Sequence, residues 1–327
     1  MKLFYNILAL GFLTVTALSL KAYDTTTDTH LKIVKGYKND LVKEKTKVCN
    51  ILALSGGGSH AAFEAGVTTK LIKEKGKTWD HLSGISAGSI NAVYYSAYNI
   101  SDLNDLLIAS SKMHDIWVSL KQDDFYVLNK GMPWNWQSIY NTDPMRKTLT
   151  SYMADLQIKS SINVGAVKLT DGQMKIFTQN EIVKNAVSIM MASSSIPILF
   201  PPTFLNDEYY IDGGDFSNII IPSNLCGNEE IIQVDAILNS QTISVISPKD
   251  IKDMNMLGLL QRTLDIVSNA FFNHEIYNSV LCQNPKGVIH VYQPSYNINS
   301  SMLNFDHNEE IYQLGLKVGE PTDYLIC

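Results

Sequence analysis

The sequence contains little arginine and no cluster of basic residues. Only two of its 26 basic residues are arginines, Arg146 and Arg262, and the formal net charge is −6. Nucleic-acid-binding proteins rely on basic patches and on the forked arginine side chain to contact phosphates and bases. The composition therefore argues against nucleic-acid binding.

The chain also lacks several motifs of known chemistry. No two of its cysteines form a C-x-x-C pair, which argues against a zinc site or a redox motif. A Walker A loop, a G-x-G-x-x-G fingerprint, internal repeats and low-complexity blocks are missing as well. In an oxidising compartment four cysteines allow two disulfides in three pairings, and buried free thiols are the alternative. The cysteines are Cys49, Cys226, Cys282 and Cys327.

What is present begins with a signal-peptide pattern at the N-terminus. Lys2 is followed by an uncharged run, residues 3–20, which ends in small residues. Cleavage is expected after Ser19 or Ala22, and an uncleaved signal anchor is the alternative because the run just reaches membrane-spanning length. We expect a protein that is secreted or delivered to an endolysosomal or vacuolar lumen, with a signal-anchored membrane protein as the alternative.

Beyond residue 47 the chain has the pattern of an α/β protein, and its 45% hydrophobic and 18% charged residues are typical of a globular domain. Apolar runs over 48–54 and 81–85 each lead into a turn and then into helical spacing. This order predicts a parallel sheet with covering helices. Downstream patterns predict helices over 106–120, 144–156, 181–193 and 257–281, a hairpin over 164–177, and strands over 209–211, 231–238 and 287–292.

The turn after the second strand has the form G-x-S-x-G. Ser86 is flanked by Gly84 and Gly88. At a strand-to-helix junction this motif presents the serine hydroxyl as a nucleophile, and the glycines permit the tight turn and close helix packing. Ser86 is therefore the candidate nucleophile for acyl transfer, with a structural glycine turn as the alternative.

The turn after the first strand consists of Gly56, Gly57 and Gly58. Consecutive glycines can expose backbone N–H groups at the start of a helix, where the positive end of the helix dipole favours an anion. This loop is the candidate oxyanion hole. Because loss of one such donor commonly costs about 3–4 kcal/mol, we expect the loop to matter about as much as the catalytic base.

Asp212 is the candidate base for Ser86. It ends a short apolar run, and Gly213 and Gly214 after it let the backbone approach another loop closely. An ordinary aspartate is a weak base, but burial would raise its pKa. No histidine fits as well, because α/β-hydrolases place the nucleophile after several strands rather than after the second. The histidines considered are His60, His81 and His114, and downstream His274, His290 and His307.

Taken in order, these segments resemble the patatin-like phospholipase family. "LALSGGGSHAAFEAGV" resembles its glycine-rich oxyanion motif, "GISAGSINA" its nucleophile motif and "IDGGDFSN" its aspartate motif. "TDPMRKTL" and "MASSSIPILFPP" resemble two further family segments that lie between them. The similarity covers residues 48–222. Together with the N-terminal pattern, it predicts four parts: a signal peptide (1–22), an N-terminal extension (23–47), a patatin-like catalytic core (48–222) and a C-terminal part of the same domain (223–327).

The resemblance implies a three-layer α/β/α sandwich with a mainly parallel central sheet. It also implies an enzyme that hydrolyses acyl esters without a histidine, a metal or a cofactor. Ser86 would be the nucleophile, Asp212 the base and the glycine loop the oxyanion hole. The implied activity is that of a phospholipase A or lysophospholipase, with a lipid substrate and peripheral membrane contact. An α/β-hydrolase-type esterase with a downstream histidine, and a catalytically silent lipid-binding or storage protein, are the alternatives.

His60 and the aromatic segment 125–136 each allow two interpretations. The family usually carries Arg or Lys where this chain has His60, so this residue could weaken the loop or a head-group contact, or make activity favour mildly acidic pH. A solvated residue in the first helical turn is the alternative. The aromatic segment 125–136 is a candidate lid or membrane-contacting lip, and a buried core loop is the alternative.

Overall fold

The computed structural model describes residues 47–130, 137–227, 231–239, 287–295 and 300–326, together with 251–252, 254, 258–259, 262–263, 266 and 298. All of them belong to one unit, Ile33–Cys327. The predicted signal peptide, the extension up to residue 46, Cys282, Cys327 and most of the helix expected over 257–281 lie outside the described residues. The division into domains therefore stays a prediction.

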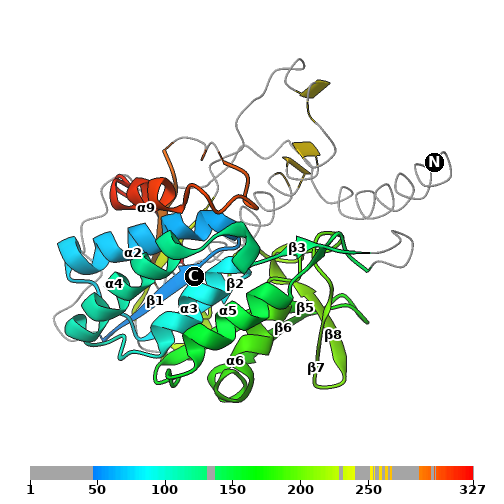
Figure 1. Cartoon of the computed structure of the whole chain (residues 1–327). Coiled ribbons are helices and arrows are strands. Elements are labelled where there is room, and N and C mark those ends of the chain that lie inside the picture. Colours follow the sequence, from blue (N-terminus) through cyan, green and yellow to red (C-terminus); the bar gives the residue numbers. More distant parts are fainter. Residues whose placement is uncertain are drawn as a thin grey trace, which may run out of the picture. The chain divides into compact units, whose positions relative to one another are not determined.

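A mainly parallel sheet forms the centre of this unit (Figure 1). Within the described residues its strand order is β11-β10-β9-β1-β2-β5-β8-β7, and β6 also pairs with β5. The parallel strands are β10 (Gly287–Tyr292), β9 (Ile231–Ile237), β1 (Val48–Leu54), β2 (His81–Ile85) and β5 (Ser161–Lys168). The antiparallel strands are β11 (Thr322–Ile326), β6 (Met174–Thr178), β8 (Glu208–Asp212) and β7 (Thr203–Leu205).

The central strands are apolar because both of their faces are covered. In β1, Leu52 and Leu54 join the larger core cluster, whereas Ile51 and Ala53 join a second cluster. Alternate residues of a strand point to opposite faces of the sheet, so the two clusters mark its two faces. A nearly continuous apolar run is typical of such a strand.

Helices cover the face of the larger cluster (Figure 1). Their ends follow sequence signals: Asp102 accepts hydrogen bonds from two N–H groups in the first turn of α4, and α2 ends at Gly76 in the left-handed conformation. No helix within the described residues is long and apolar enough to cross a bilayer. The helices are α2 (Ala61–Lys75), α3 (Ala87–Ser96), α4 (Leu103–Ser119), α5 (Asp143–Met153), α6 (Gln179–Ser193) and α9 (Asn308–Leu316).

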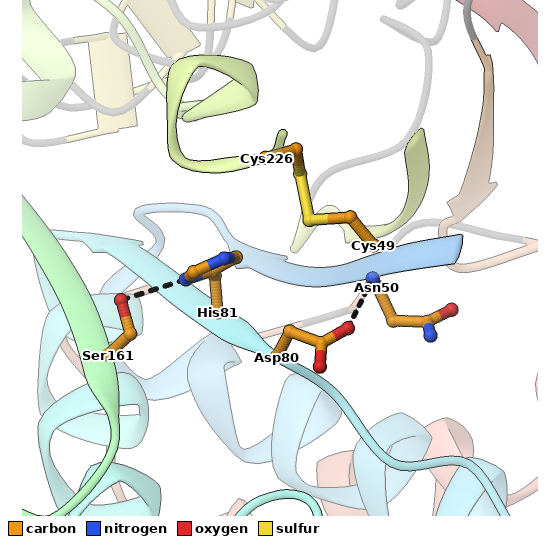
Figure 2. Close-up of a disulfide and its surroundings, with 6 residues drawn as sticks. All are labelled: Cys49, Asn50, Asp80, His81, Ser161 and Cys226. Carbon is orange, nitrogen blue, oxygen red and sulfur yellow. Dashed lines mark hydrogen bonds between the residues drawn. A yellow bond between two sulfur atoms is a disulfide. The ribbon is translucent and has the colours of Figure 1, made fainter. Parts of the chain in front are cut away.

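The segment that follows β8 covers part of the opposite face. Ile219 belongs to the second core cluster, and the carbonyl oxygen of Ile220 accepts a hydrogen bond from Ser83 of β2 at 2.6 Å. Farther along, Cys226 forms a disulfide with Cys49 of β1 (Figure 2), one of the pairings that the sequence left open. The mainly parallel sheet with flanking helices confirms the predicted α/β fold class.

The aromatic segment 125–136 divides between core and surface. Phe125 and Tyr126 are buried, and the Phe125 ring stacks on Phe305 with centroids 4.3 Å apart. The next two residues form β3 (Val127–Leu128), which is exposed and pairs with β4 (Tyr140–Asn141). The buried-loop alternative is thus correct for the first two residues, and 131–136 lie outside the described part of the chain.

Candidate active site

Ser86 occupies a strained turn between β2 and α3, the place that the sequence predicts. Its φ of 51° and ψ of −127° are a combination that serine rarely adopts, at a cost of about 1–3 kcal/mol. The flanking glycines make the turn possible. A Cβ atom on Gly84 would lie 2.5 Å from the carbonyl oxygen of Gly88, and one on Gly88 would lie 2.4 Å from that of Ser55. Any side chain at either position would force α3 away from the sheet.

The register of the sheet makes Ser86 and Asp212 neighbours. Strand β6 occupies one edge of β5, along a stretch that overlaps the pairings of both β2 and β8. β2 and β8 must therefore pair with the other edge of β5. On that edge β2 ends with Ile85 opposite Gly165, and β8 ends with Asp212 opposite Ala166. Because β2 runs parallel and β8 antiparallel to β5, their carboxyl ends meet.

The two side chains are joined by a short hydrogen bond. The Ser86 hydroxyl donates to Asp212 Oδ2 at 2.6 Å, and the N–H of Gly214 donates to Oδ1 at 2.7 Å. Ser86 and Asp212 are each only 5% exposed. Burial raises the pKa of Asp212 to about 7, although both hydrogen bonds act to lower it. A carboxylate with a pKa near the working pH is a much better general base than an ordinary aspartate.

A second carboxyl group, Asp215, lies close to the first. It ends η5 (Gly213–Asp215), the short helix that Asp212 caps. Its Oδ2 atom is buried and has no hydrogen-bond partner among the described residues. Burial and the neighbouring charge of Asp212 raise the pKa of Asp215 to about 8. Asp215 is therefore mostly protonated at pH 7, when Asp212 is partly ionised.

The end of α6 holds the backbone of both residues. Ser193 Oγ accepts the N–H of Ser86 at 2.8 Å and donates to the carbonyl of Gly165 at 2.7 Å. Two residues later, the carbonyl of Ser195 accepts the N–H of Asp212 at 3.0 Å. Sequence reasoning assigned no role to these serines, because their partners lie on strands far away in the chain.

The glycine loop lies against Ser86. A Cβ atom on Gly56 would be 3.0 Å from Ser86 Cβ. The N–H of Gly56 is already bonded to Asn218, to its carbonyl at 3.2 Å and to Oδ1 at 3.1 Å. Within the described residues the N–H groups of Gly57 and Gly58 have no hydrogen-bond partner. Of the three predicted oxyanion donors, the N–H groups of Gly57 and Gly58 are thus available. The N–H of Gly56 instead ties the loop to the aspartate segment through Asn218. No sequence pattern had indicated a role for Asn218.

His60 braces the glycine loop from its other end. Its Nε2–H donates to the carbonyl of Ser300 at 2.8 Å, and its own N–H donates to the carbonyl of Gly57 at 3.1 Å. Burial lowers the pKa of His60 below 6.5, against the raising effect of the Ser300 hydrogen bond. The residue is therefore uncharged at neutral pH. These contacts favour a role for His60 in holding the glycine loop in place. They argue against a head-group contact and against a solvated position.

The remaining described histidines have other partners. His81 bonds to Ser161 Oγ at 2.8 Å, at the amino ends of β2 and β5 (Figure 2). The others pair with acids: His114 with Glu309 at 3.0 Å, His290 with Asp323 at 2.7 Å and His307 with Glu310 at 3.3 Å. His274 lies outside the described residues.

One cluster of metal-ligand type exists within the described residues, at the amino ends of the strands. Ligand atoms of Cys49, His81 and Cys226 lie within 4.8 Å of one another (Figure 2). The two sulfur atoms are joined as a disulfide, whereas the metal-binding form of cysteine is the thiolate. We assign no metal to this cluster.

Fold and site together define an α/β protein with a buried Ser–Asp pair beside a glycine-rich turn. The sequence profile of the family "Patatin-like phospholipase" matches residues 52–224, more than half of the chain, and the chain belongs to this family. A lipid substrate and a general lipid acyl hydrolase activity follow from that membership.

Similar solved structures include VipD from Legionella pneumophila, which is 13% identical over 86% of this chain and 68% of that chain, with a TM-score of 0.37. ExoU from the type III secretion system of Pseudomonas aeruginosa, solved with SpcU, is 16% identical over 69% of this chain, with a TM-score of 0.29. This chain spans 52% of that structure's length. A search of curated proteins finds no match.

Proposed function

We propose that the protein is a lipid acyl hydrolase of the phospholipase A or lysophospholipase type. It cleaves carboxylic esters through an acyl-enzyme on Ser86, with Asp212 as general base. The observation that carries the proposal is the buried 2.6 Å hydrogen bond between Ser86 Oγ and Asp212 Oδ2. Further support comes from the pKa of Asp212, about 7, and from the N–H groups of Gly57 and Gly58, which have no hydrogen-bond partner in the described part of the chain.

In the first half-reaction Asp212 accepts the Ser86 proton while Oγ attacks the ester carbonyl carbon. The carbonyl oxygen becomes an oxyanion, which accepts hydrogen bonds from the N–H groups of Gly57 and Gly58. When the ester C–O bond breaks, the leaving alcohol takes the proton from Asp212. In the second half-reaction Asp212 takes a proton from water, whose oxygen attacks the acyl carbon, and the fatty acid leaves as this proton returns to Ser86 Oγ.

The two alternatives from the sequence have less support. An esterase with a histidine base would need an imidazole next to Ser86, but the serine hydroxyl donates to Asp212, and His290 and His307 pair with acids. Alanine at His274, His290 and His307 together should therefore leave activity intact. A silent lipid-binding protein would not need a serine held at positive φ beside a base of raised pKa, since such strain is retained mainly at functional sites.

The proposal extends to location and membrane contact. The Cys49–Cys226 disulfide supports an oxidising compartment, where such bonds persist. Leu128 is 61% exposed and Phe204 is 56% exposed, and the Phe204 ring packs at a tilt against Tyr209 with the centroids 4.9 Å apart. Apolar groups are therefore available to touch a lipid surface. Mass spectrometry of the mature protein should give a chain that begins after Ser19 or Ala22. A chain that retains residue 1 would reject signal cleavage.

The direct test combines labelling with hydrolysis. Wild-type protein should react with a serine-directed fluorophosphonate and release fatty acid from phosphatidylcholine or lysophosphatidylcholine in mixed micelles. Ser86→Ala should abolish both, and Asp212→Asn should slow both. Ser119→Ala and Asp123→Asn, at exposed sites, serve as matched controls and should behave as wild type. Labelling that survives Ser86→Ala would overturn the mechanism.

A further inference from the structure

Beneath the glycine loop lies a buried carboxyl group that the proposed mechanism does not use. Glu64, in the first turn of α2, is 0% exposed and forms no ion pair with any described residue. Burial raises the pKa of Glu64 well above its usual value, although hydrogen bonds from Asn91, Ser55 and Asn239 oppose this shift. A buried carboxyl group without a cation keeps its proton, so Glu64 has one O–H to donate.

The surrounding amides decide which oxygen carries that proton. Trp117 Nε1 donates to Asn91 Oδ1 at 2.7 Å, which fixes the orientation of this amide. Its Nδ2 therefore faces the acceptors, the carbonyl of Ala61 at 3.0 Å and Glu64 Oε2 at 3.1 Å. Both carboxyl oxygens of Glu64 therefore face an amide donor, Oε2 that of Asn91 and Oε1 that of Asn239 at 2.9 Å. A donor cannot accept the Glu64 proton, whereas the hydroxyl oxygen of Ser55, 3.3 Å from Oε1, can. The proton therefore belongs on Oε1.

The Ser55 hydroxyl connects this carboxyl group to the glycine loop. Its Oγ accepts the N–H of Asn239 at 3.1 Å and lies 3.3 Å from both Glu64 Oε1 and the carbonyl oxygen of Gly56. A hydroxyl has one proton and two lone pairs. When Glu64 donates to Ser55 Oγ, the serine proton is left for the Gly56 carbonyl; an ionised Glu64 would take that proton for itself.

The Gly56 carbonyl in turn sets the direction of the next N–H. A trans peptide unit is planar, with its C=O and N–H on opposite sides. A Gly56 carbonyl held toward Ser55 therefore points the Gly57 N–H away from the buried network. This N–H is one of the two loop donors that have no partner among the described residues.

We propose that Glu64 and Ser55 are positioning residues that keep the Gly57 N–H aimed at the oxyanion, through the chain Glu64–Ser55–Gly56. This role rests on the proposed ester hydrolysis, because the two residues act on the same active site. Neither residue touches the substrate, so their contribution appears only when the oxyanion forms.

The test is steady-state hydrolysis of a soluble short-chain ester by Glu64→Ala, Ser55→Ala and Glu64→Gln. Because loss of one oxyanion donor costs about 100- to 1,000-fold in kcat, misalignment of one should lower kcat by about 10- to 100-fold and leave KM nearly unchanged. Glu64→Gln keeps a neutral side chain with a donor for Ser55. Asn239 can meet this new donor by turning toward it its Oδ1 atom, which has no hydrogen-bond partner among the described residues, so the variant should restore most of the activity. The double variant Glu64→Ala/Ser55→Ala should be no slower than either single variant, since both act through one chain.

Thr69→Val is the matched control. Thr69 is buried on the same helix, and its hydrogen bonds, to Ala65 and Tyr312, do not reach the glycine loop. This variant should keep the wild-type kcat even if its stability falls. Where Glu64→Ala fails to fold, Ser55→Ala, which removes a single oxygen atom, carries the same comparison.

The outcomes separate this inference from the proposed function. A wild-type protein without hydrolysis or fluorophosphonate labelling would contradict the proposed function itself. An active wild type whose Ser55→Ala variant keeps its kcat, or a Glu64→Gln variant as slow as Glu64→Ala, would overturn the positioning role alone. Reduced kcat at constant KM with rescue by Glu64→Gln supports it.

Discussion

The two ends of the parallel strands differ in how far their polar groups are satisfied. At the carboxyl ends lie Ser86 with positive φ, two unpaired N–H groups within the described loop, and buried acids of raised pKa. At the amino ends the groups shown in Figure 2 are paired: His81 bonds to Ser161, and Asp80 accepts the N–H of Asn50 at 2.9 Å. One end holds the candidate catalytic groups, and the groups at the other end are joined by hydrogen bonds and a disulfide.

The segment 212–226, here called the aspartate strap, links the two ends. It begins with the candidate base, bonds to Gly56 through Asn218, accepts a hydrogen bond from β2 at Ile220 and finishes at the disulfide to Cys49. Through this strap, the strained site at the carboxyl ends of the strands is anchored at their amino ends. Changes at the carboxyl ends should therefore alter rate, and changes at the amino ends should alter stability.

The largest effect on rate is expected from Asp212→Asn. Without the base, kcat should fall by about 10⁴-fold, as when the acid of a catalytic triad is neutralised. The unfolding free energy should stay the same or rise, because a buried ionisable group is removed. Ester hydrolysis and urea denaturation measure the two quantities. A stability loss as large as the rate loss would erase the difference between the two ends.

Gly57→Ala should come next. An added Cβ atom would lie 2.6 Å from Asn239 Cβ and displace the loop, so kcat should fall by about 100- to 1,000-fold. Gly319→Ala is the matched control, since no atom lies within 4 Å of its added Cβ. Wild-type kcat in Gly57→Ala would show that this N–H plays no part in the reaction.

At the amino ends, replacing Cys49 and Cys226 by serine should reverse the pattern. Removal of the cross-link should lower the unfolding free energy by about 2–5 kcal/mol, with little change in kcat well below the unfolding temperature. Denaturant titration and rate measurements on the same samples give both values. A large fall in kcat in a fully folded sample would mean that the strap needs the disulfide to place the base.

The pH–rate profile should report the two acids of the strap. Asp212 acts as a base only when ionised, so kcat/KM should rise with pH through about 7, and ionisation of Asp215 should add a coupled step near 8. Asp215→Asn should remove the second step and leave the first. The folded protein binds more protons than the unfolded chain between 3.8 and these raised values, so stability should fall as pH rises across that window.

The smallest effect is expected from His60→Lys. Because burial lowers its pKa, His60 is already uncharged at the pH near 7 at which Asp212 ionises. The profile should keep its shape, with a modest loss of rate from the changed contact to Ser300. A shift of the optimum to higher pH would instead support the hypothesis that His60 makes activity favour mildly acidic conditions.

The sequence places the candidate site residues at the carboxyl ends of the strands because the signals for these positions are local, and their catalytic roles stay predictions. Ser86, Asp212 and the glycine turn stand at strand ends marked by glycine, and the strands and helices around them appear as expected. The missed residues act over long distances in the chain: Asn218 reaches Gly56 across 162 residues and Ser193 reaches Ser86 across 107. No local pattern encodes such contacts.

Other elements escaped prediction for a different reason. β3 and β4 contain two residues each, and β7 contains three, which is too short for an alternating pattern to emerge. The aromatic residues at 125 and 126 resemble a lip in sequence but are buried against Phe305. Whether such side chains are exposed or buried depends on packing partners that lie far away in the chain.

The most direct test of the central claim is mass spectrometry of the protein during turnover of a slowly deacylating ester. The account predicts a mass increase equal to one acyl group, located on the peptide that contains Ser86, absent in Ser86→Ala and slow to form in Asp212→Asn. Hydrolysis with the adduct on another residue, or an unchanged adduct in Ser86→Ala, would contradict the Ser86–Asp212 mechanism.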